Sequence, residues 1–169
     1  MAAEPALVDT NVLLEATDEH RAHHADAVAL LESVAPLTFS SQVVREYLAV
    51  ATRPVAANGL GLSTVDALAN IREFRRTVRL LPEERPILAT FLALLARVPC
   101  TGTRVHDAHI VATALVHRVR AIVSLNLDDF RPFASEVGIV TPVQALRTLA
   151  EARQARARRR RTPRSAGGP

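Results

Sequence analysis

Short apolar segments alternate along the whole chain with longer segments of helical periodicity, and this alternation constrains the fold more than any other feature. The apolar segments are residues 6–8, 37–39, 78–81, 121–124 and 138–140. Strands that alternate with helices form a parallel sheet covered by helices on both faces. We therefore expect an α/β fold in three layers, with a central parallel sheet of about four to five strands.

The segments between the expected strands have the features of helices. In residues 21–33, for example, apolar side chains recur at helical spacing, and Ser40 or Ser41 can cap the next helix. Pro142 suits the first turn of a last helix, which we expect to end at residue 151. The other expected helices are 11–16, 42–53, 63–76, 83–97 and 105–117, with a loop at 54–62 and a turn at 130–132.

Acidic residues recur beside the expected strands. Asp9 directly follows the first strand, Asp128 and Asp129 follow the fourth, Glu46 lies early in the helix after the second, and Asp107 opens the helix that leads into the fourth. Parallel sheets of this kind carry their sites at the carboxyl ends of the strands. Because desolvating a carboxylate is costly, four acidic positions beside core elements predict one shared site.

The chemistry of these residues favours a hard cation. Ligand sets made of oxygen, without Cys or a His pair, suit Mg²⁺ or Mn²⁺. The single cysteine, Cys100, excludes a disulfide framework and a thiolate zinc cluster. Like charges about 4 Å apart repel by roughly 4 kcal/mol at an effective dielectric constant near 20. Such a cluster therefore predicts a bound metal.

The absence of lysine excludes several functions, because all 21 basic residues are arginine. A P-loop nucleotide-binding site and a Schiff-base enzyme each need a lysine. A haloacid-dehalogenase-type phosphatase is also excluded, since this class needs a lysine and Asn11 stands where its second aspartate would be.

The arginines are unevenly distributed. Residues 152–169 hold seven arginines and no acid, which leaves 14 arginines against 17 acids, a net charge of −3, in residues 1–151. We expect one folded domain over 1–151 and a disordered Arg-rich tail over 152–169. Such a tail either neutralises RNA phosphates or is merely solvated.

No segment of the sequence predicts export or membrane insertion. The start of the chain lacks a basic stretch followed by a long apolar stretch, and the apolar runs are far shorter than a membrane span. Together with the cysteine count, this favours a cytoplasmic protein with no membrane contact.

Four segments, taken in order and spacing, resemble the motifs of PIN domains. They are VDTN (8–11), VVRE (43–46), HDA (106–108) and SLNLDDF (124–130). The pattern is similar to that of VapC-type ribonuclease toxins from type II toxin–antitoxin pairs, and it covers roughly residues 6–145. Each motif alone is weak, whereas the ordered set is specific.

The resemblance implies an Mg²⁺- or Mn²⁺-dependent endoribonuclease that hydrolyses phosphodiester bonds in single-stranded or loop RNA. Asp9, Glu46, Asp107 and Asp129 would be its catalytic residues and metal ligands, with Glu46 binding directly or through water. A small antitoxin protein would block the site, and a homodimer is expected.

The fourth acidic position departs from the strictest family pattern. Many members carry aspartate where this chain has Asn126, so Asn126, Asp128 or Asp129 completes the site. The alternative is that the two aspartates only cap a turn. Asp9 and Asp107 also have structural alternatives to metal binding. Asp9 could be only a helix cap, and Asp107 only a charge that the dipole of its helix favours.

Neighbouring polar residues are expected to support the site. Ser124 would orient Asp9 or a metal-bound water, and Thr10 and Asn11 either support the carboxylates or only cap a helix. Arg45 flanks an acidic motif and is a candidate for holding RNA phosphates. Arg104 and His106 are further candidates.

Two other functions remain compatible with the sequence. One is a housekeeping RNA-processing nuclease with the same chemistry. The other is a non-catalytic RNA-binding module that uses the PIN scaffold and the Arg-rich tail, and it would not depend on metal.

Overall fold

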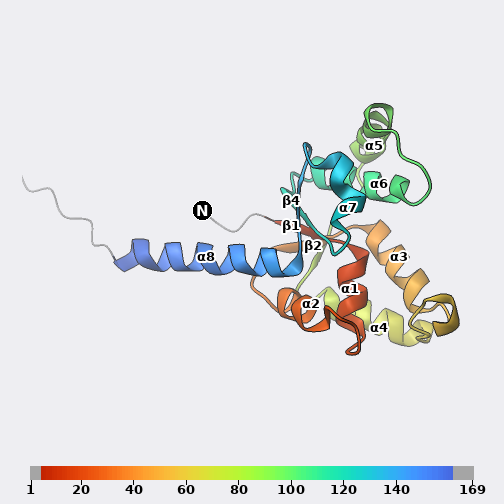
Figure 1. Cartoon of the computed structure of the whole chain (residues 1–169), viewed down its shortest axis with the longest axis horizontal. Helices are drawn as coiled ribbons and strands as arrows, with labels where there is room; N and C mark the ends of the chain where they lie inside the picture. The colour runs from red at the N-terminus through yellow and green to blue at the C-terminus, as the bar shows by residue number, and fades with distance from the viewer. Residues whose placement is uncertain (1–4, 162–169) are drawn as a thin grey trace, which may run out of the picture.

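The computed structural model describes residues 5–161 and contains a five-stranded, fully parallel sheet (Figure 1). This confirms the predicted α/β class. The strand order is β3-β2-β1-β4-β5. The strands are β1 (Ala6–Val8), β2 (Leu37–Phe39), β3 (Arg79–Leu80), β4 (Ala121–Val123) and β5 (Gly138–Val140). Within the described residues, no helix is long and apolar enough to cross a membrane.

Strand β1 is the centre of the sheet, and the chain builds outward from it in two directions. Leu7 pairs with Thr38 of β2 on one side and with Ile122 of β4 on the other. The strands β2 and β3 extend one half, after which the chain crosses over and adds β4 and β5 to the opposite half. In open parallel sheets the crevice at such a reversal of strand order is where ligands bind. Here it lies between the carboxyl ends of β1 and β4.

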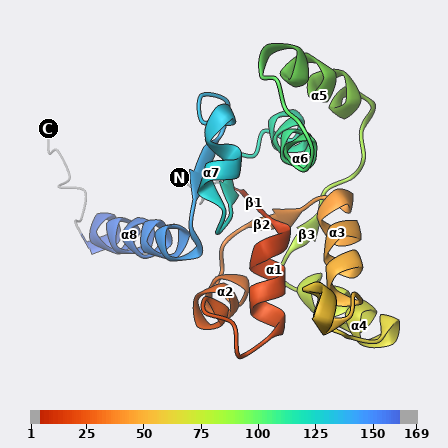
Figure 2. The same cartoon turned by 45° about the vertical axis from the view of Figure 1, so that its right-hand side comes forward.

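Helices cover the sheet on both faces, which gives the three expected layers (Figure 2). The first four helices lie on one side of the strands, and α5 and α6 lie on the other. Their bounds are α1 (Thr10–Thr17), α2 (His24–Leu31), α3 (Ser41–Ala51), α4 (Thr64–Phe74), α5 (Arg85–Arg97) and α6 (Arg104–Val116). The expected helices are thus confirmed, with ends that differ by at most three residues.

The core is formed by the strands and the inner faces of these helices. Leu7, Phe39 and Ile122 are fully buried in the sheet. Leu13 of α1 and Tyr47 of α3 are also fully buried. Burying one such side chain contributes about 1.5–3 kcal/mol. The central strands are therefore rigidly held, and so are the residues at their ends.

The turn expected at 130–132 is helical instead. Residues 127–133 form α7 (Leu127–Phe130) and a 3₁₀ turn (Arg131–Phe133). Phe130 and Phe133 are both fully buried. A helical spacing of three residues places both rings on the same side, toward the core, which an open turn would not do.

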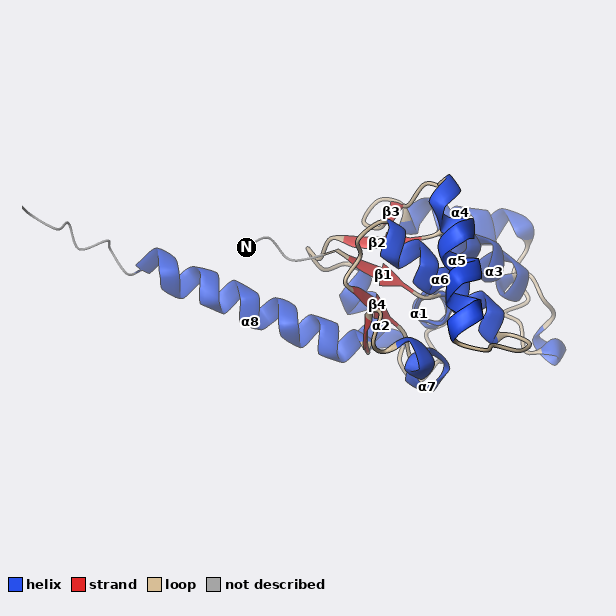
Figure 3. Ribbon diagram, turned by 90° about the horizontal axis from the view of Figure 1, so that it is seen from above, coloured by secondary structure: helices blue, strands red, loops and turns tan. Residues whose placement is uncertain are grey.

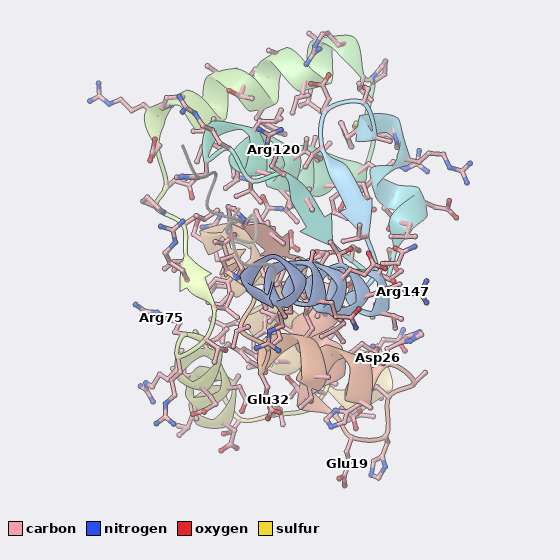
Figure 4. The ribbon with its side chains drawn as sticks, turned by 90° about the vertical axis from the view of Figure 1, so that its left-hand side faces the viewer. Glu19, Asp26, Glu32, Arg75, Arg120 and Arg147 are labelled. Atoms are coloured by element: carbon pink, nitrogen blue, oxygen red, sulfur yellow. The ribbon has the colours of Figure 1, made fainter. Side chains whose placement is uncertain are left out.

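The last helix is longer than expected. Helix α8 (Pro142–Arg161) packs on α2 through its first part and then leaves the body of the molecule (Figures 1 and 3). Figure 4 looks along it, with Arg147 of α8 and Glu32, directly after α2, labelled. Residues 152–161 are therefore helical rather than a disordered tail, because alanine, arginine and glutamine are strong helix formers. Residues 162–169 lie outside the described part of the chain.

Candidate active site

Asp9 lies where β1 ends and α1 begins, and three hydrogen bonds fix its carboxylate. The backbone N–H of Thr10 donates to Oδ1 at 2.6 Å. The hydroxyl of Ser124 and the amide Nδ2 of Asn11 each donate to Oδ2 at 2.7 Å. Asp9 is only 7% exposed. Through the Thr10 bond Asp9 caps α1, as the sequence allowed, and through the Ser124 bond it also contacts the residue that directly follows β4.

Ser124 and Asn11 connect the ends of the two central strands. Asn11 donates from Nδ2 to the Ser124 Oγ at 2.9 Å, and its Oδ1 accepts the N–H of Leu125 at 3.1 Å. The Ser124 Oγ also accepts the N–H of Asn126 at 3.0 Å. One donated and two accepted bonds use the full capacity of a hydroxyl. The structure thus places Ser124 against Asp9 and makes Asn11 more than a helix cap.

Glu46 reaches the same crevice from α3. Its Oε2 accepts the hydroxyl of Thr10 at 2.9 Å, and its Oε1 accepts the amide Nε2 of Gln42 at 2.7 Å. Helix α3 is started by Ser40, whose hydroxyl accepts the N–H of Val43 at 3.2 Å. This cap sets the helix directly after β2 and aims Glu46 at the end of β1.

Gln42 is a site residue that the sequence analysis missed. Its Nε2 donates to Glu46 and also to the backbone carbonyl of His106 at 3.0 Å, and it is only 6% exposed. It therefore joins α3 to the start of α6. Its position four residues before Glu46, on the same helix face, was the available signal.

Burial and neighbouring charges raise the pKa of Asp9 to about 6. Burial is the largest cause, and the charges of Glu46 and Asp129 add to it. The hydrogen bonds from Ser124 and from the Thr10 backbone act in the opposite direction. The ionised carboxylate thus costs free energy in the metal-free protein.

Asp107 shows the same behaviour from the other face of the sheet. It lies in the first turn of α6, is half-buried, and its pKa is raised to about 6. Burial is the largest cause, followed by the charges of Asp9, Asp129 and Glu46, while His106 lowers it. The four carboxylates therefore lie close enough to act on one another electrostatically, as one cluster.

Of the three candidates for the fourth position, Asp129 faces this cluster. It is half-buried, and its charge acts on both Asp9 and Asp107. Asp128 is exposed and accepts a hydrogen bond from the Arg131 guanidinium at 2.7 Å. Asn126 is exposed at the start of α7. The geometry therefore favours Asp129.

The cluster offers a hard cation only oxygen ligands. Among the described residues, no three Asp, Glu, His or Cys side chains stand close enough to form a ready-made coordination shell. Mg²⁺ keeps several of its waters and binds through one or two carboxylates together with substrate phosphate. The mutually repelling carboxylates fit such a hydrated ion, which would neutralise them.

The fold and site together define a class, a parallel α/β domain with an acidic cluster at the reversal of strand order. The sequence matches the family model of the PIN domain over residues 6–135. The chain therefore belongs to the PIN domain family. No curated protein sequence is similar enough to count as a match.

Solved structures of toxin–antitoxin proteins share the fold. VapBC2 from Rickettsia felis, bound to a fragment of its promoter DNA, has a TM-score of 0.61 and 13% identity, covering 81% of this chain and 98% of that one. A toxin–antitoxin complex from Klebsiella pneumoniae has a TM-score of 0.57 and 25% identity, over 81% and 97%. VapC20 from Mycobacterium tuberculosis, a sarcin–ricin loop cleaving toxin, has a TM-score of 0.54 and 20% identity, covering 69% of this chain and 86% of that one.

Proposed function

We propose that this protein is a metal-dependent endoribonuclease and the toxin of a type II toxin–antitoxin pair. The observation that carries the proposal is the cluster of Asp9, Glu46, Asp107 and Asp129 between the ends of β1 and β4, in a PIN domain. Its acids repel one another, so the site suits a cation, and through that cation an anionic phosphodiester, better than a neutral ligand. The fold neighbours support the assignment, since one is a toxin that cleaves the sarcin–ricin loop.

Each carboxylate has a proposed role. Asp9 and Asp107 hold Mg²⁺ or Mn²⁺, while Glu46 and Asp129 complete the shell directly or through water. When bound, such a cation supplies an activated water and stabilises charge on the leaving oxygen of an in-line phosphodiester cut.

The surrounding residues hold the carboxylates in place before the substrate arrives. Ser124 and Asn11 fix one oxygen of Asp9 and favour its ionised form. Thr10 and Gln42 each bind one oxygen of Glu46. Because these hydrogen bonds come from α1, α3 and the residue that directly follows β4, the cluster needs little rearrangement to bind its ion.

The proposed partners follow from the same reading. The RNA substrate is single-stranded or in a loop, so that its backbone can approach the crevice. A small cognate antitoxin binds over the carboxylates and blocks them, and the toxin itself forms a homodimer. The fold neighbours crystallised as toxin–antitoxin complexes support an antitoxin partner. The protein acts in the cytoplasm, where its RNA substrate is found.

Cleavage of RNA by the purified protein tests the assignment. With Mn²⁺, the wild type is expected to cut single-stranded RNA, whereas Asp9→Asn is expected to lose at least 100-fold in rate, about 2.7 kcal/mol in the barrier. Asp128→Asn is the matched control, because this exposed neighbour of the cluster binds Arg131 instead. Equal cleavage by wild type and Asp9→Asn would contradict the proposal.

Expression of the chain without its partner separates the toxin from a housekeeping nuclease. A toxin is expected to arrest growth, and Asp9→Asn is expected to restore it. Normal growth with an active wild-type enzyme would favour RNA processing instead.

A further inference from the structure

An open pocket of about 380 Å³ lies between α3, α5 and α6. Its apolar walls are the ring of Phe91, the methyl group of Ala49 and the side chain of Val105. The Phe91 ring is held edge-on against the His109 imidazole, with ring centroids 5.3 Å apart. The pocket thus has an aromatic wall whose position is fixed.

The pocket adjoins the carboxylate cluster, because Glu46 belongs to both. Glu46 and Gln42 line it, and so does His106, whose Nδ1 lies 3.7 Å from the Glu46 Oε1. Asp107 follows His106 directly in α6. A phosphodiester held at the cluster would therefore place an adjoining nucleotide at the mouth of this pocket.

The rim also carries a cation. Arg45 lines the pocket from α3, and its guanidinium lies 3.4 Å from the Ser41 hydroxyl, to which it donates. Arginine is suited to phosphate oxygens and to stacking on bases. These groups match the parts of one nucleotide. The apolar aromatic wall suits a base, the guanidinium suits a phosphate, and the adjoining carboxylate cluster is where the phosphodiester would be cut.

We infer that this pocket receives one unpaired base of the RNA next to the bond that is cut, and that it sets the sequence preference of the cleavage. This inference rests on the proposed function. The volume is near the lower end of small-ligand pockets, which span about 300–1,000 Å³, and it suits a single nucleoside. A base must leave its duplex to enter, because unpaired bases are the ones that proteins stack on aromatic side chains.

Cut-site sequencing with a random-sequence RNA tests the inference. Four proteins are compared, namely the wild type, Phe91→Ala, Ala49→Trp and the control Leu92→Ala. Ala49 is exposed on α3, so its replacement fills the pocket without removing any core contact. Leu92 is 56% exposed on the same helix as Phe91 and does not line the pocket.

The wild type and Leu92→Ala are expected to prefer one base at a position flanking the cut. Phe91→Ala and Ala49→Trp are expected to lose this preference and to bind a short single-stranded RNA about 5- to 150-fold more weakly, the range for loss of one stacked base. The affinity is measured in an Asp9→Asn background, so that the RNA stays intact.

The outcomes separate the inference from the proposed function. If the wild type cuts RNA and all four proteins share one preference and one affinity, the pocket has no part in RNA recognition and the inference is overturned. That result is also expected if the pocket receives a peptide of a partner protein. If the wild type does not cut RNA, the proposed function fails, and the affinities alone decide on the pocket.

Discussion

The hydroxyl of Ser124, at the end of β4, donates a 2.7 Å hydrogen bond to the carboxylate of Asp9, at the end of β1, across 115 residues of sequence. This contact spans the reversal of strand order in the sheet. It ties the first acid of the site to the segment that carries Asp129. The charge state of Asp9 therefore depends on a fully buried hydroxyl from a distant part of the chain.

Replacing Ser124 with alanine is expected to raise the pKa of Asp9 further above 6, because this hydrogen bond lowers it. Cleavage by Ser124→Ala should fall most below pH 7 and recover partly at higher pH, so its pH–rate profile shifts toward alkaline values. Stability should fall by about 1–3 kcal/mol, since the N–H groups of Asn11 and Asn126 lose an acceptor. Ser135→Ala, at an exposed serine, is the control. A uniform loss of activity at every pH would show that Ser124 has only a structural role.

Asp107→Asn is expected to stabilise the metal-free protein at pH 8. The folded pKa of about 6 exceeds the ordinary value of 3.8, so this group's contribution to stability is present below pH 3.8 and lost as the pH rises through 6. Because Asp107 is half-exposed, the gain should be at most about 1 kcal/mol. Urea unfolding in EDTA at pH 8 and pH 4 measures it, and the difference should vanish at pH 4.

The same measurement decides between two readings of Asp107. If this residue only complemented the dipole of α6, removal of its charge would lower stability by about 0.3–1 kcal/mol at pH 8. A less stable Asp107→Asn at pH 8 would therefore contradict the acidic cluster.

Gln42 is expected to act by positioning Glu46. Gln42→Leu keeps a side chain of similar size but loses the donors to Glu46 and to the His106 carbonyl. The loss of such hydrogen bonds predicts a decrease in kcat of about 5- to 30-fold with little change in KM. Gln154→Leu, at an exposed glutamine of α8, is the control. A change confined to KM would contradict the positioning role.

Deleting residues 152–169 tests whether the Arg-rich end of the chain contacts RNA. The deletion removes seven arginines. If all seven neutralise phosphates, the slope of log K against log salt should become less steep by about 5 for single-stranded RNA. Fluorescence anisotropy with a labelled RNA at several salt concentrations measures it. An unchanged slope would show that these arginines are only solvated.

The sheet and the positions of the candidate site residues were largely predictable, because both depend on local patterns. Apolar segments bounded by polar residues gave the strands, and the rule that parallel strands place their carboxyl ends together located Asp9. Glu46 and Asp107 lie on helices rather than at strand ends, and the motifs VVRE (43–46) and HDA (106–108) pointed to them.

The parts that could not be predicted depend on contacts between distant segments. Gln42 enters the site only because α6 brings the His106 carbonyl within reach. The choice of Asp129 over Asp128 depends on Phe130 and Phe133, whose burial makes this segment helical and turns Asp128 toward Arg131. The pocket beside Phe91 depends on how α5 packs against α6 and on where both lie relative to α3.

The metal dependence of RNA cleavage tests the central claim most directly. The purified protein is stripped of metal with EDTA, and its cleavage of a single-stranded RNA is measured as Mn²⁺ or Mg²⁺ is added back, for the wild type and for Asp107→Asn. We expect no cleavage without metal, a saturable rise in rate for the wild type, and a rate for Asp107→Asn that stays at least 100-fold lower, about 2.7 kcal/mol in the barrier. Equal cleavage by the wild type with and without metal would contradict the account.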